Sequence, residues 1–352
     1  MGSWFSVGSD PWDLDPSYFE KWYNLNIREG LGKFETDALE AIDTALIALA
    51  RRMACSKRNL FDVREVIKGG SLITGTATKD LTDIDVVVFV NSPHLVPIGC
   101  SSVQDYKAKL KSLIDELAKA LGAVPSVIIR QSDACQVNFD FVVGGRSLRV
   151  NFFPTADNFS GYALGPSDIF KEMMQLGGYD RGLYSASLVK YQRDFVKNQP
   201  CTVKELIRLV KFWAHTCLPQ ALQKSYPLEL ITIYRWENTG KPALFKNVQG
   251  LKDVLRFLSA LQVLRHYWTE MYDEELAEQS ITKLGHRNPI LLDPANPTNN
   301  VCWVYQKGDN IELLKSAAES TLRSKLLTDV IVYPNWWGRR DPYDFLCNDA
   351  EN

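Results

Sequence analysis

Two neighbouring stretches decide the fold of this 352-residue chain: GGSLITGT at residues 69–76 and DIDVVVFV at residues 83–90. Glycines let a backbone approach phosphate oxygens closely, and the hydroxyl of Ser71 adds a hydrogen-bond donor. The second stretch starts with two acids and continues as an apolar, β-branched run, which is typical of a buried strand. The pair therefore predicts a phosphate-binding turn followed by a strand that carries acids.

Asp83 and Asp85 are the candidate metal ligands. Side chains of a strand alternate between its two faces, so these carboxylates point the same way and can hold a divalent cation together. Enzymes that transfer groups between phosphates use two such cations about 3.5 to 4 Å apart. A glycine turn alone, or two acids alone, is also a common surface feature. In this order and at this spacing, however, they predict the nucleotidyltransferase fold with its polymerase-beta-like core.

Beyond these stretches the pattern divides the chain into an α+β half and a helical half. Apolar residues at helical spacing predict long helices over residues 33–57 and 103–121. Strands are expected at residues 63–67, 127–131 and 135–153, with Gly144-Gly145 as a hairpin turn. Further helices are expected at residues 203–217, 228–239, 250–271 and 310–326. We therefore expect an N-terminal arm (1–32), an α+β nucleotidyltransferase core with a mixed sheet (33–160) and a helical lobe (161–352), with the active-site cleft between core and lobe.

Composition excludes several classes of protein. The net charge of −2 gives no overall attraction to polyanions, so any nucleic-acid site must be a local patch. The seven cysteines are scattered without a Cys-x-x-Cys pair, and none of the four histidines lies near two of them, so no structural zinc is expected. The sequence shows neither a run of about twenty apolar residues nor a secretory signal, so we expect a soluble, cytoplasmic protein.

The first six residues, MGSWFS, match a signal for N-myristoylation at Gly2. A single acyl chain gives only weak, reversible attachment, so the protein would associate with membranes marginally. Gly-Ser after Met is also what a cloning scar looks like, and both interpretations stay open.

Five blocks of the chain resemble the 2′-5′-oligoadenylate synthases. They are VIKGGS (66–71), YQRDFVK (191–197), LIRLVKFW (206–213), YPLELITIYRWE (226–237) and DPANPTNN (293–300). The blocks follow the order of the family and span most of the chain. The resemblance implies an enzyme of innate antiviral signalling that double-stranded RNA activates and that polymerises ATP, with Mg²⁺ as its cofactor.

The resemblance also assigns roles to individual residues. It implies that Gly70 and Ser71 bind the triphosphate of ATP, while the two acids ligate Mg²⁺ in a two-metal site. It implies that Lys211 reaches phosphates and that Tyr226 stacks on an adenine, because such a site needs a cation and an aromatic face. Without the resemblance, Lys211 could be a solvated helix charge and Tyr226 a capping aromatic. Thr74 departs from the family, which usually has lysine there, and this weakens the expected grip on phosphate.

The family's third catalytic acid lies on a strand just before a proline, in a context like LRVNFFP (148–154), where this chain has Asn151. An amide cannot accept the proton of an attacking hydroxyl, and loss of such a base typically costs about 10² to 10⁴ in rate. Across a two-residue hairpin turn, Asn138 would face Asn151. Asp140 would face Arg149, its nearer partner, and is therefore a poor substitute for the missing acid. Asn151 marks either a natural chain with little or no activity or a replacement that traps substrate.

An RNA duplex is recognised by shape, through phosphates and 2′-hydroxyls, so an activating surface needs cations and short polar groups on a rigid face. The residues that match the family's RNA contacts, or lie close to them, are Lys68, Arg193, Lys197, Thr202 and Lys204. This face could extend to Arg51, Arg52, Lys57, Arg58 and Arg64. Scattered basic residues can also simply solubilise a helix. The implied mechanism is a switch, in which the duplex shifts the helix near residues 35–57 and brings the turn and the acids into register.

Three functions stay open. The leading one is a synthase of 2′-linked adenylate chains that double-stranded RNA activates. A cyclic-dinucleotide synthase of the cyclic GMP-AMP type shares the core, but its inserted zinc ribbon has no counterpart here. A protein that only binds RNA, inactive because of Asn151, belongs to a different class.

Overall fold

The computed structural model describes residues 10–29, 36–37, 39–40, 43–44, 63–78, 83–90, 95–124, 127–143, 146–159 and 165–336. The chain forms two compact units. The first, the sheet unit, comprises Gly30–Asn198 and Arg265–Cys302. The second, the helical unit, comprises Met1–Glu29, Gln199–Leu264 and Trp303–Asn352.

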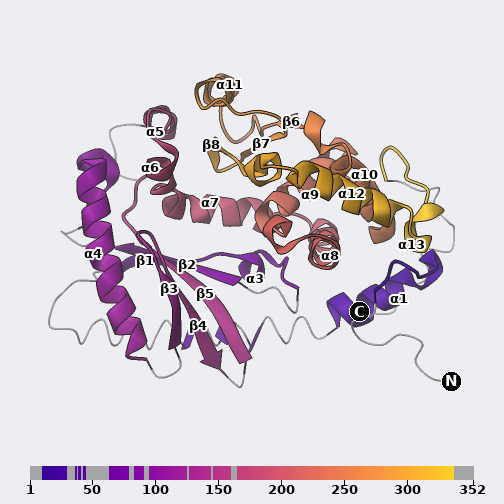
Figure 1. The fold of residues 1–352 in the computed structure, drawn as a ribbon, viewed down its shortest axis with the longest axis horizontal. Coiled ribbons are helices and arrows are strands. Elements are labelled where there is room, and N and C mark those ends of the chain that lie inside the picture. The colour runs from indigo at the N-terminus through magenta and orange to yellow at the C-terminus, as the bar shows by residue number, and fades with distance from the viewer. Residues whose placement is uncertain are drawn as a thin grey trace. The chain divides into compact units, whose positions relative to one another are not determined.

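A five-stranded mixed sheet is the centre of the sheet unit (Figure 1). Its strands lie in the order β1 (Val63–Lys68), β2 (Asp83–Val90), β5 (Arg146–Thr155), β4 (Val137–Val143) and β3 (Val127–Ser132). β2 and β5 are parallel, while the other neighbouring strands are antiparallel. The strands predicted from the apolar runs are therefore confirmed, and so is the α+β fold class.

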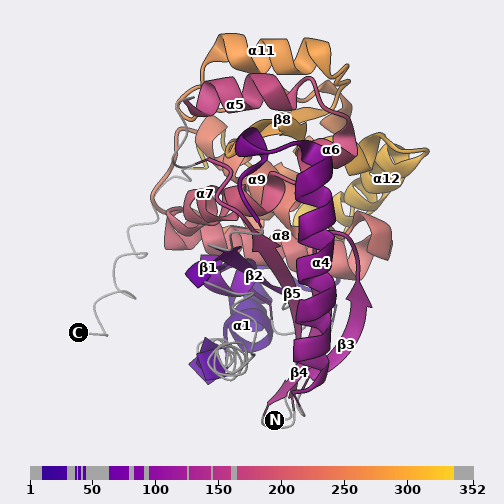
Figure 2. The same cartoon turned by 90° about the vertical axis from the view of Figure 1, so that its left-hand side faces the viewer.

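The helix α4 (Val103–Gly122) runs along one face of this sheet, as Figures 1 and 2 show. It begins after Ser102, whose hydroxyl accepts a hydrogen bond from the Asp105 amide at 3.0 Å. Its buried stripe is Tyr106, Leu110, Leu113, Ile114, Leu117 and Leu121. These side chains share one core with Ile84, Val86 and Val88 of β2. The helix predicted at residues 103–121 is thus confirmed.

The helix α7 (Ser185–Lys197) covers the opposite face of the sheet. There Ala186 and Val189 pack against a core formed by Ile67, Val87 and Phe89. Because strand side chains alternate, Val87 and Phe89 lie on the same face as position 85. Asp85, near the start of β2, therefore belongs to the face that α7 covers.

The hairpin between β4 and β5 has the predicted register. Val143 pairs with Arg146, which leaves two residues for the turn. Asn138 lies opposite Asn151, and Asp140 lies opposite Arg149. The polar residues of β4 and β5 therefore share the α7 face with the acids.

Shorter elements complete the sheet unit: α3 (Ser71–Thr74), η3 (Ile98–Cys100), α5 (Pro166–Met173), α6 (Gly178–Gly182) and α11 (Glu274–Lys283). A second sheet has the order β6 (Arg265–His266), β7 (Ile290–Asp293) and β8 (Asn296–Asn300). Asp293 is fully buried and accepts hydrogen bonds from the Gln192 side chain at 2.6 Å and from the Ala295 amide at 2.9 Å. The DPANPTNN block thus ties α7 to the small sheet.

The described part of the helical unit consists of helices and their connections. These helices are η1 (Pro16–Tyr18), α1 (Phe19–Tyr23), η2 (Asn24–Arg28), α8 (Cys201–Cys217), η4 (Gln220–Leu222), α9 (Ser225–Asn238), α10 (Asn247–Leu258), η5 (Leu261–Val263), α12 (Asn310–Leu322) and α13 (Lys325–Thr328), while η6 (Val301–Gln306) follows β8 in the chain. The aromatic N-terminal residues pack on α8. The Trp22 ring meets the Phe212 ring edge-on at 5.2 Å, and the Tyr23 hydroxyl donates to the Glu205 carbonyl at 3.1 Å.

One predicted helix is too long. The apolar pattern predicted a continuous helix over residues 250–271, but α10 ends at Leu258. The Ser259 hydroxyl donates to the Arg256 carbonyl at 2.7 Å just beyond this end. The chain then forms β6, which pairs with β7 from a later part of the sequence. Tertiary pairing here overrides the local helical preference.

Three observations concern the predicted location and chemistry of the chain. Five described cysteines, at positions 100, 135, 201, 217 and 302, are free thiols. In the part of the chain that the structure describes, no helix combines the length and the apolar character needed to cross a bilayer. Gly2, the expected myristoylation site, lies outside the described residues.

Candidate active site

The glycine turn connects β1 to the short helix α3. The Gly69 amide donates to the Asp85 carbonyl at 2.7 Å, which holds the turn against the start of β2. Gly70 has a φ of +81°, a left-handed conformation that favours glycine. Its carbonyl accepts a hydrogen bond from the Ile73 amide at 3.1 Å, and α3 begins at Ser71. Ser71 therefore stands directly behind the two glycines, as the predicted phosphate turn requires.

Gly69 has no room for a side chain. An added Cβ at this position would lie 2.8 Å from Cγ1 of Val189 on α7 and 3.5 Å from Cβ of Asp85. The glycine turn is thus clamped between the strand that carries the acids and the helix above them.

The pairing of β2 with β5 brings the acids next to Asn151. In this parallel register Asp83 lies opposite Arg149, and Asp85 lies opposite Asn151. The Asn151 side-chain nitrogen donates to Oδ1 of Asp85 at 2.9 Å. For Asp83 the structure describes the backbone only. Position 151 therefore lies within hydrogen-bond distance of the Asp85 carboxylate.

The residues present fit one divalent cation better than two. Carboxylates at positions 83 and 85 are the hard oxygen donors that Mg²⁺ takes. The third position supplies a neutral amide, whose nitrogen is directed at Asp85. Among the described residues no group of three or more acids, histidines or cysteines could hold a metal ion. Asp83 and Asp85 are therefore the candidate ligands of one cation, and the acid that a pair of metals needs is missing.

Asn138 is a further candidate, to which the sequence alone assigned no role. It faces Asn151 from β4, and its side-chain oxygen is buried without a hydrogen-bond partner among the described residues. A buried acceptor in this condition costs about 1–3 kcal/mol. A ligand hydroxyl or a metal-bound water at this position would satisfy it. The predicted hairpin register could have indicated this candidate, because it sets Asn138 opposite Asn151.

Asp140 is held by an arginine that the sequence did not indicate. It is buried and accepts hydrogen bonds from Nε of Arg130 at 2.7 Å and from the same guanidinium's Nη2. Arg149, the expected partner, is the residue directly opposite. The ladder between β3 and β4 shifts at Arg130, because Ile129 and Gln131 pair with consecutive residues of β4. Because Ile128 lies opposite Asp140, Arg130 shares its face and reaches it diagonally.

Thr74, which stands where the family usually has lysine, is buried at the end of α3. Its hydroxyl lies 2.9 Å from the Thr76 hydroxyl and donates to the Ser71 carbonyl at 3.2 Å. The residue therefore closes the short helix and offers no cation to a ligand.

Lys211 and Tyr226 belong to the helical unit. Lys211 of α8 is buried, and its Nζ lies 3.3 Å from Oε1 of Glu229 on α9, which is also buried. Tyr226 is half-buried in the first turn of α9, one turn before Glu229, so both share a face of that helix. Glu229 was not singled out from the sequence. The feature of the sequence that could have indicated it is the single acid within the apolar run LELITI.

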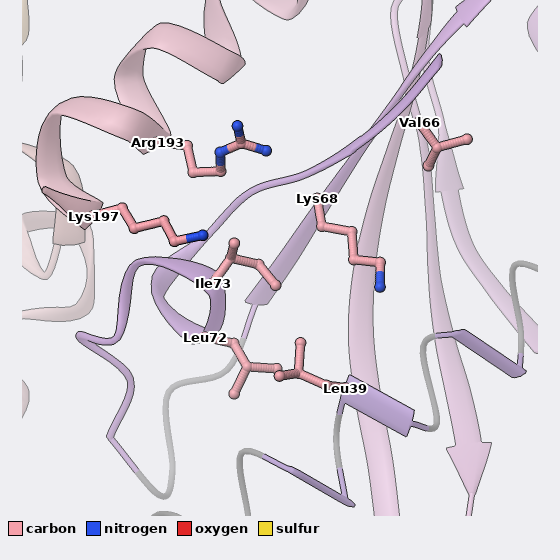
Figure 3. Close-up of a pocket in the computed structure, with 7 residues that line it drawn as sticks. All are labelled: Leu39, Val66, Lys68, Leu72, Ile73, Arg193 and Lys197. Carbon is pink, nitrogen blue, oxygen red and sulfur yellow. The ribbon is translucent and has the colours of Figure 1, made fainter. Parts of the chain in front are cut away.

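Three of the predicted RNA-contacting residues line one pocket of the sheet unit, with a volume of about 410 Å³ (Figure 3). Lys68 comes from β1, while Arg193 and Lys197 come from α7. Lys68 forms an ion pair with Asp43, and Arg193 forms one with Asp194 at 2.7 Å. The pocket therefore gathers three cations at the edge of the sheet.

The other predicted RNA contacts are placed as follows. Thr202 and Lys204 lie in the first turn of α8, in the helical unit, where the Thr202 hydroxyl donates to the Ala243 carbonyl at 3.3 Å. Arg64 pairs with Asp157 at 3.0 Å in the sheet unit. The remaining candidates of the extended face, at positions 51, 52, 57 and 58, lie outside the described residues.

The geometry defines the class of protein as a nucleotidyltransferase, and comparison with known proteins agrees. Residues 51–146 match the family model described as “Nucleotidyltransferase domain”. The “Structure of E. coli MS115-1 CdnC:HORMA-deltaN complex” aligns with a TM-score of 0.53 at 19% identity, covering 91% of this chain and 96% of that one. Terminal uridylyl transferase 4 from Trypanosoma brucei with bound dUTP aligns with a TM-score of 0.53 at 13% identity, covering 85% and 97%. At these identities the similarity concerns the fold alone.

Closer relatives define the family. Residues 165–338 match the model “2'-5'-oligoadenylate synthetase 1, domain 2, C-terminus”. The chain is 31% identical to 2'-5'-oligoadenylate synthase 1A of Rattus norvegicus over 313 residues, covering 78% of this chain and 81% of the relative. It is 30% identical to Inactive 2'-5'-oligoadenylate synthase 1B of Rattus norvegicus over 299 residues, covering 78% and 77%. The chain therefore belongs to the 2′-5′-oligoadenylate synthase family.

We expect Gly69→Ala to lower the free energy of unfolding by about 1–3 kcal/mol, because the new methyl group would overlap Val189. Urea denaturation measures this loss. In a Val189→Ala background the same substitution should cost less, since the opposing methyl group is gone. An equal cost in both backgrounds would contradict the clamp.

We expect Lys211→Met to lower the free energy of unfolding by about 3–5 kcal/mol, because it leaves the buried Glu229 carboxylate without its cation. The double variant Lys211→Met/Glu229→Leu should recover most of this stability, since it removes both charges. Denaturation of the two proteins under the same conditions makes the comparison. A double variant as unstable as the single one would show that the pair is not the cause.

Proposed function

We propose that this chain binds ATP with a divalent cation at the glycine turn and the β2 acids, that double-stranded RNA stimulates it, and that it joins adenylates through 2′-5′ bonds at a rate limited by Asn151. The observation that carries the proposal is the 2.9 Å hydrogen bond from Asn151 to Asp85. This contact beside the acids supports the assignment of position 151 as the family's third position, and in this proposal the site differs from that of the family by one charge.

Nucleotide binding is supported by the backbone of the turn. Gly70 has no Cβ to cover its backbone, and its positive φ is a conformation that favours glycine. The Ser71 hydroxyl adds a donor beside it. Both groups suit the phosphate oxygens of ATP. Asp83 and Asp85 would hold the accompanying Mg²⁺, which when bound would neutralise charge on those oxygens.

Asn151 defines what this site can do chemically. By donating to Oδ1 of Asp85 it orients that carboxylate. Its amide oxygen is too weak a base to take the proton of an attacking 2′-hydroxyl. That proton has to leave to solvent, so we expect slow chain growth without loss of nucleotide binding.

In the helical unit, Tyr226 is the proposed adenine contact because its half-buried ring offers an aromatic face. Lys211 could reach a phosphate only by leaving Glu229. Since both partners are buried, the pair favours a role in which Lys211 fixes α8 to α9 beneath Tyr226. In this proposal Lys211 acts as a positioning residue.

A second function, RNA binding without chemistry, is favoured by the same asparagine. A relative with comparable identity and coverage is itself named inactive. RNA binding depends on the cations of the pocket and not on position 151, so it would survive the loss of the acid. The two functions differ in a single measurable property, the formation of adenylate chains.

We expect Asn151→Asp to raise oligoadenylate formation by about 10² to 10⁴, since it restores a base and a metal ligand next to Asp85. The assay contains ATP, Mg²⁺ and an RNA duplex, and the products are separated by chromatography. A parallel reaction with ATP and GTP tests for a cyclic mixed product, which would indicate a cyclic-dinucleotide synthase. Silence of both proteins, together with tight RNA binding, would establish the binding-only function.

We expect Lys68→Gln and Lys197→Gln each to weaken binding of an RNA duplex and to reduce the slope of log affinity against log salt by about one, because each removes a phosphate contact. Lys190→Gln is the matched control. It removes a cation from the same helix as Lys197, but Lys190 pairs with Glu65 at 3.5 Å and does not line the pocket. Equal effects of all three substitutions would mean that only net charge matters.

A further inference from the structure

The pocket at the edge of the sheet is lined by both apolar and cationic side chains (Figure 3). Its apolar side chains are Leu39, Val66, Leu72 and Ile73. Its cations are Lys68, Arg193 and Lys197. A group of three cations is suited to binding phosphates. The inference below rests on the proposed binding of RNA at this pocket.

The carboxylate partners of Arg193 and Lys68 lie in different parts of the chain. Arg193 pairs with Asp194, its neighbour on α7, so the two move together. Lys68 pairs with Asp43, which stands 25 residues earlier in the chain and outside the sheet. The Lys68 pair therefore joins β1 to a segment that lies outside the sheet.

The segment of Asp43 also reaches the glycine turn. Its described residues, 36–37, 39–40 and 43–44, are helical. Leu39 lies beside Leu72 in the pocket (Figure 3). It also packs against the hydrophobic core to which Leu72 belongs. Leu72 directly follows Ser71, the proposed phosphate ligand. Movement of this segment would thus change the contacts of α3 as well as those of Lys68.

We propose that Asp43 is an internal competitor of RNA: its carboxylate holds Lys68 in place of an RNA phosphate, and duplex RNA gains its contact with Lys68 by exchanging that carboxylate for one of its own phosphates. Lys68 is the residue at which this exchange takes place.

The strength of the competition follows from exposure. The Lys68 side chain is 28% exposed and the Asp43 side chain is 54% exposed, so water screens the pair. Exposed ion pairs of this kind are weak, and their loss changes an equilibrium by about two- to fivefold. Asp43→Asn should therefore raise the affinity for duplex RNA by about two- to fivefold, an increase caused by removing a carboxylate that RNA has to displace.

The test uses the full chain and a blunt RNA duplex two helical turns long, with binding followed by fluorescence anisotropy at several salt concentrations. The matched control is Glu65→Gln, which makes the same change of charge on the strand that carries Lys68. Glu65 pairs with Lys190 at 3.5 Å and is 45% exposed. Lys68→Gln and the double variant Asp43→Asn/Lys68→Gln complete a thermodynamic cycle, and Asp43→Ala repeats the test with a second side chain.

The proposal expects Asp43→Asn and Asp43→Ala to bind RNA more tightly than Glu65→Gln, and expects no gain when Lys68 is already Gln. A gain equal to that of Glu65→Gln, or a gain that persists without Lys68, overturns the competition while leaving RNA binding intact. If neither the natural chain nor the Asp43 variants bind the duplex, the proposed RNA function itself fails. Binding that appears only in the Asp43 variants supports the competition in its strongest form.

Discussion

The parallel pairing of β2 with β5 is the constraint on which the candidate site depends. It sets Asp85 opposite Asn151, while the carbonyl of the same Asp85 accepts the amide of Gly69. One residue thus anchors the glycine turn through its backbone and the third position through its side chain. A slip of β2 by one residue would turn the acids towards α4 and expose Ile84 and Val86, which are buried there. The apolar pattern of the strand therefore enforces the geometry of the site.

Much of this geometry could be predicted from local sequence. The apolar run after Asp85 identified the strand, and the two-residue turn after β4 fixed the hairpin register that sets Asn138 opposite Asn151. Both signals are short-range, since alternation and turn length act between neighbouring residues. The positions of the polar residues in the site could therefore be predicted, because these residues lie on strands whose register follows from the two signals.

The partners of charged residues could not be predicted in this way. Arg130 reaches Asp140 diagonally from the neighbouring strand, and the apolar pattern does not indicate which strand lies beside β4. Lys211 meets Glu229 only after two helices have packed, and α10 ends early because a later strand recruits the residues beyond it. In each case the partner lies on another helix or strand. Periodicity carries no information about such pairs, since a long charged side chain can follow several directions from the same backbone position.

Asn151 affects the charge repulsion between strands β2 and β5 as well as the chemistry of the site. Three carboxylates in adjacent strand positions repel one another and depend on a bound cation to offset that repulsion. Here the Asn151 side chain donates a hydrogen bond to Asp85 instead, so this pair of side chains needs no cation between them. In the proposed function, the asparagine that takes the place of the base therefore also removes a source of repulsion. A chain of this family can then keep its glycine turn, its sheet and its basic pocket while its catalytic rate falls, because Gly69 and Val189 hold the turn in place whether or not a third acid is present.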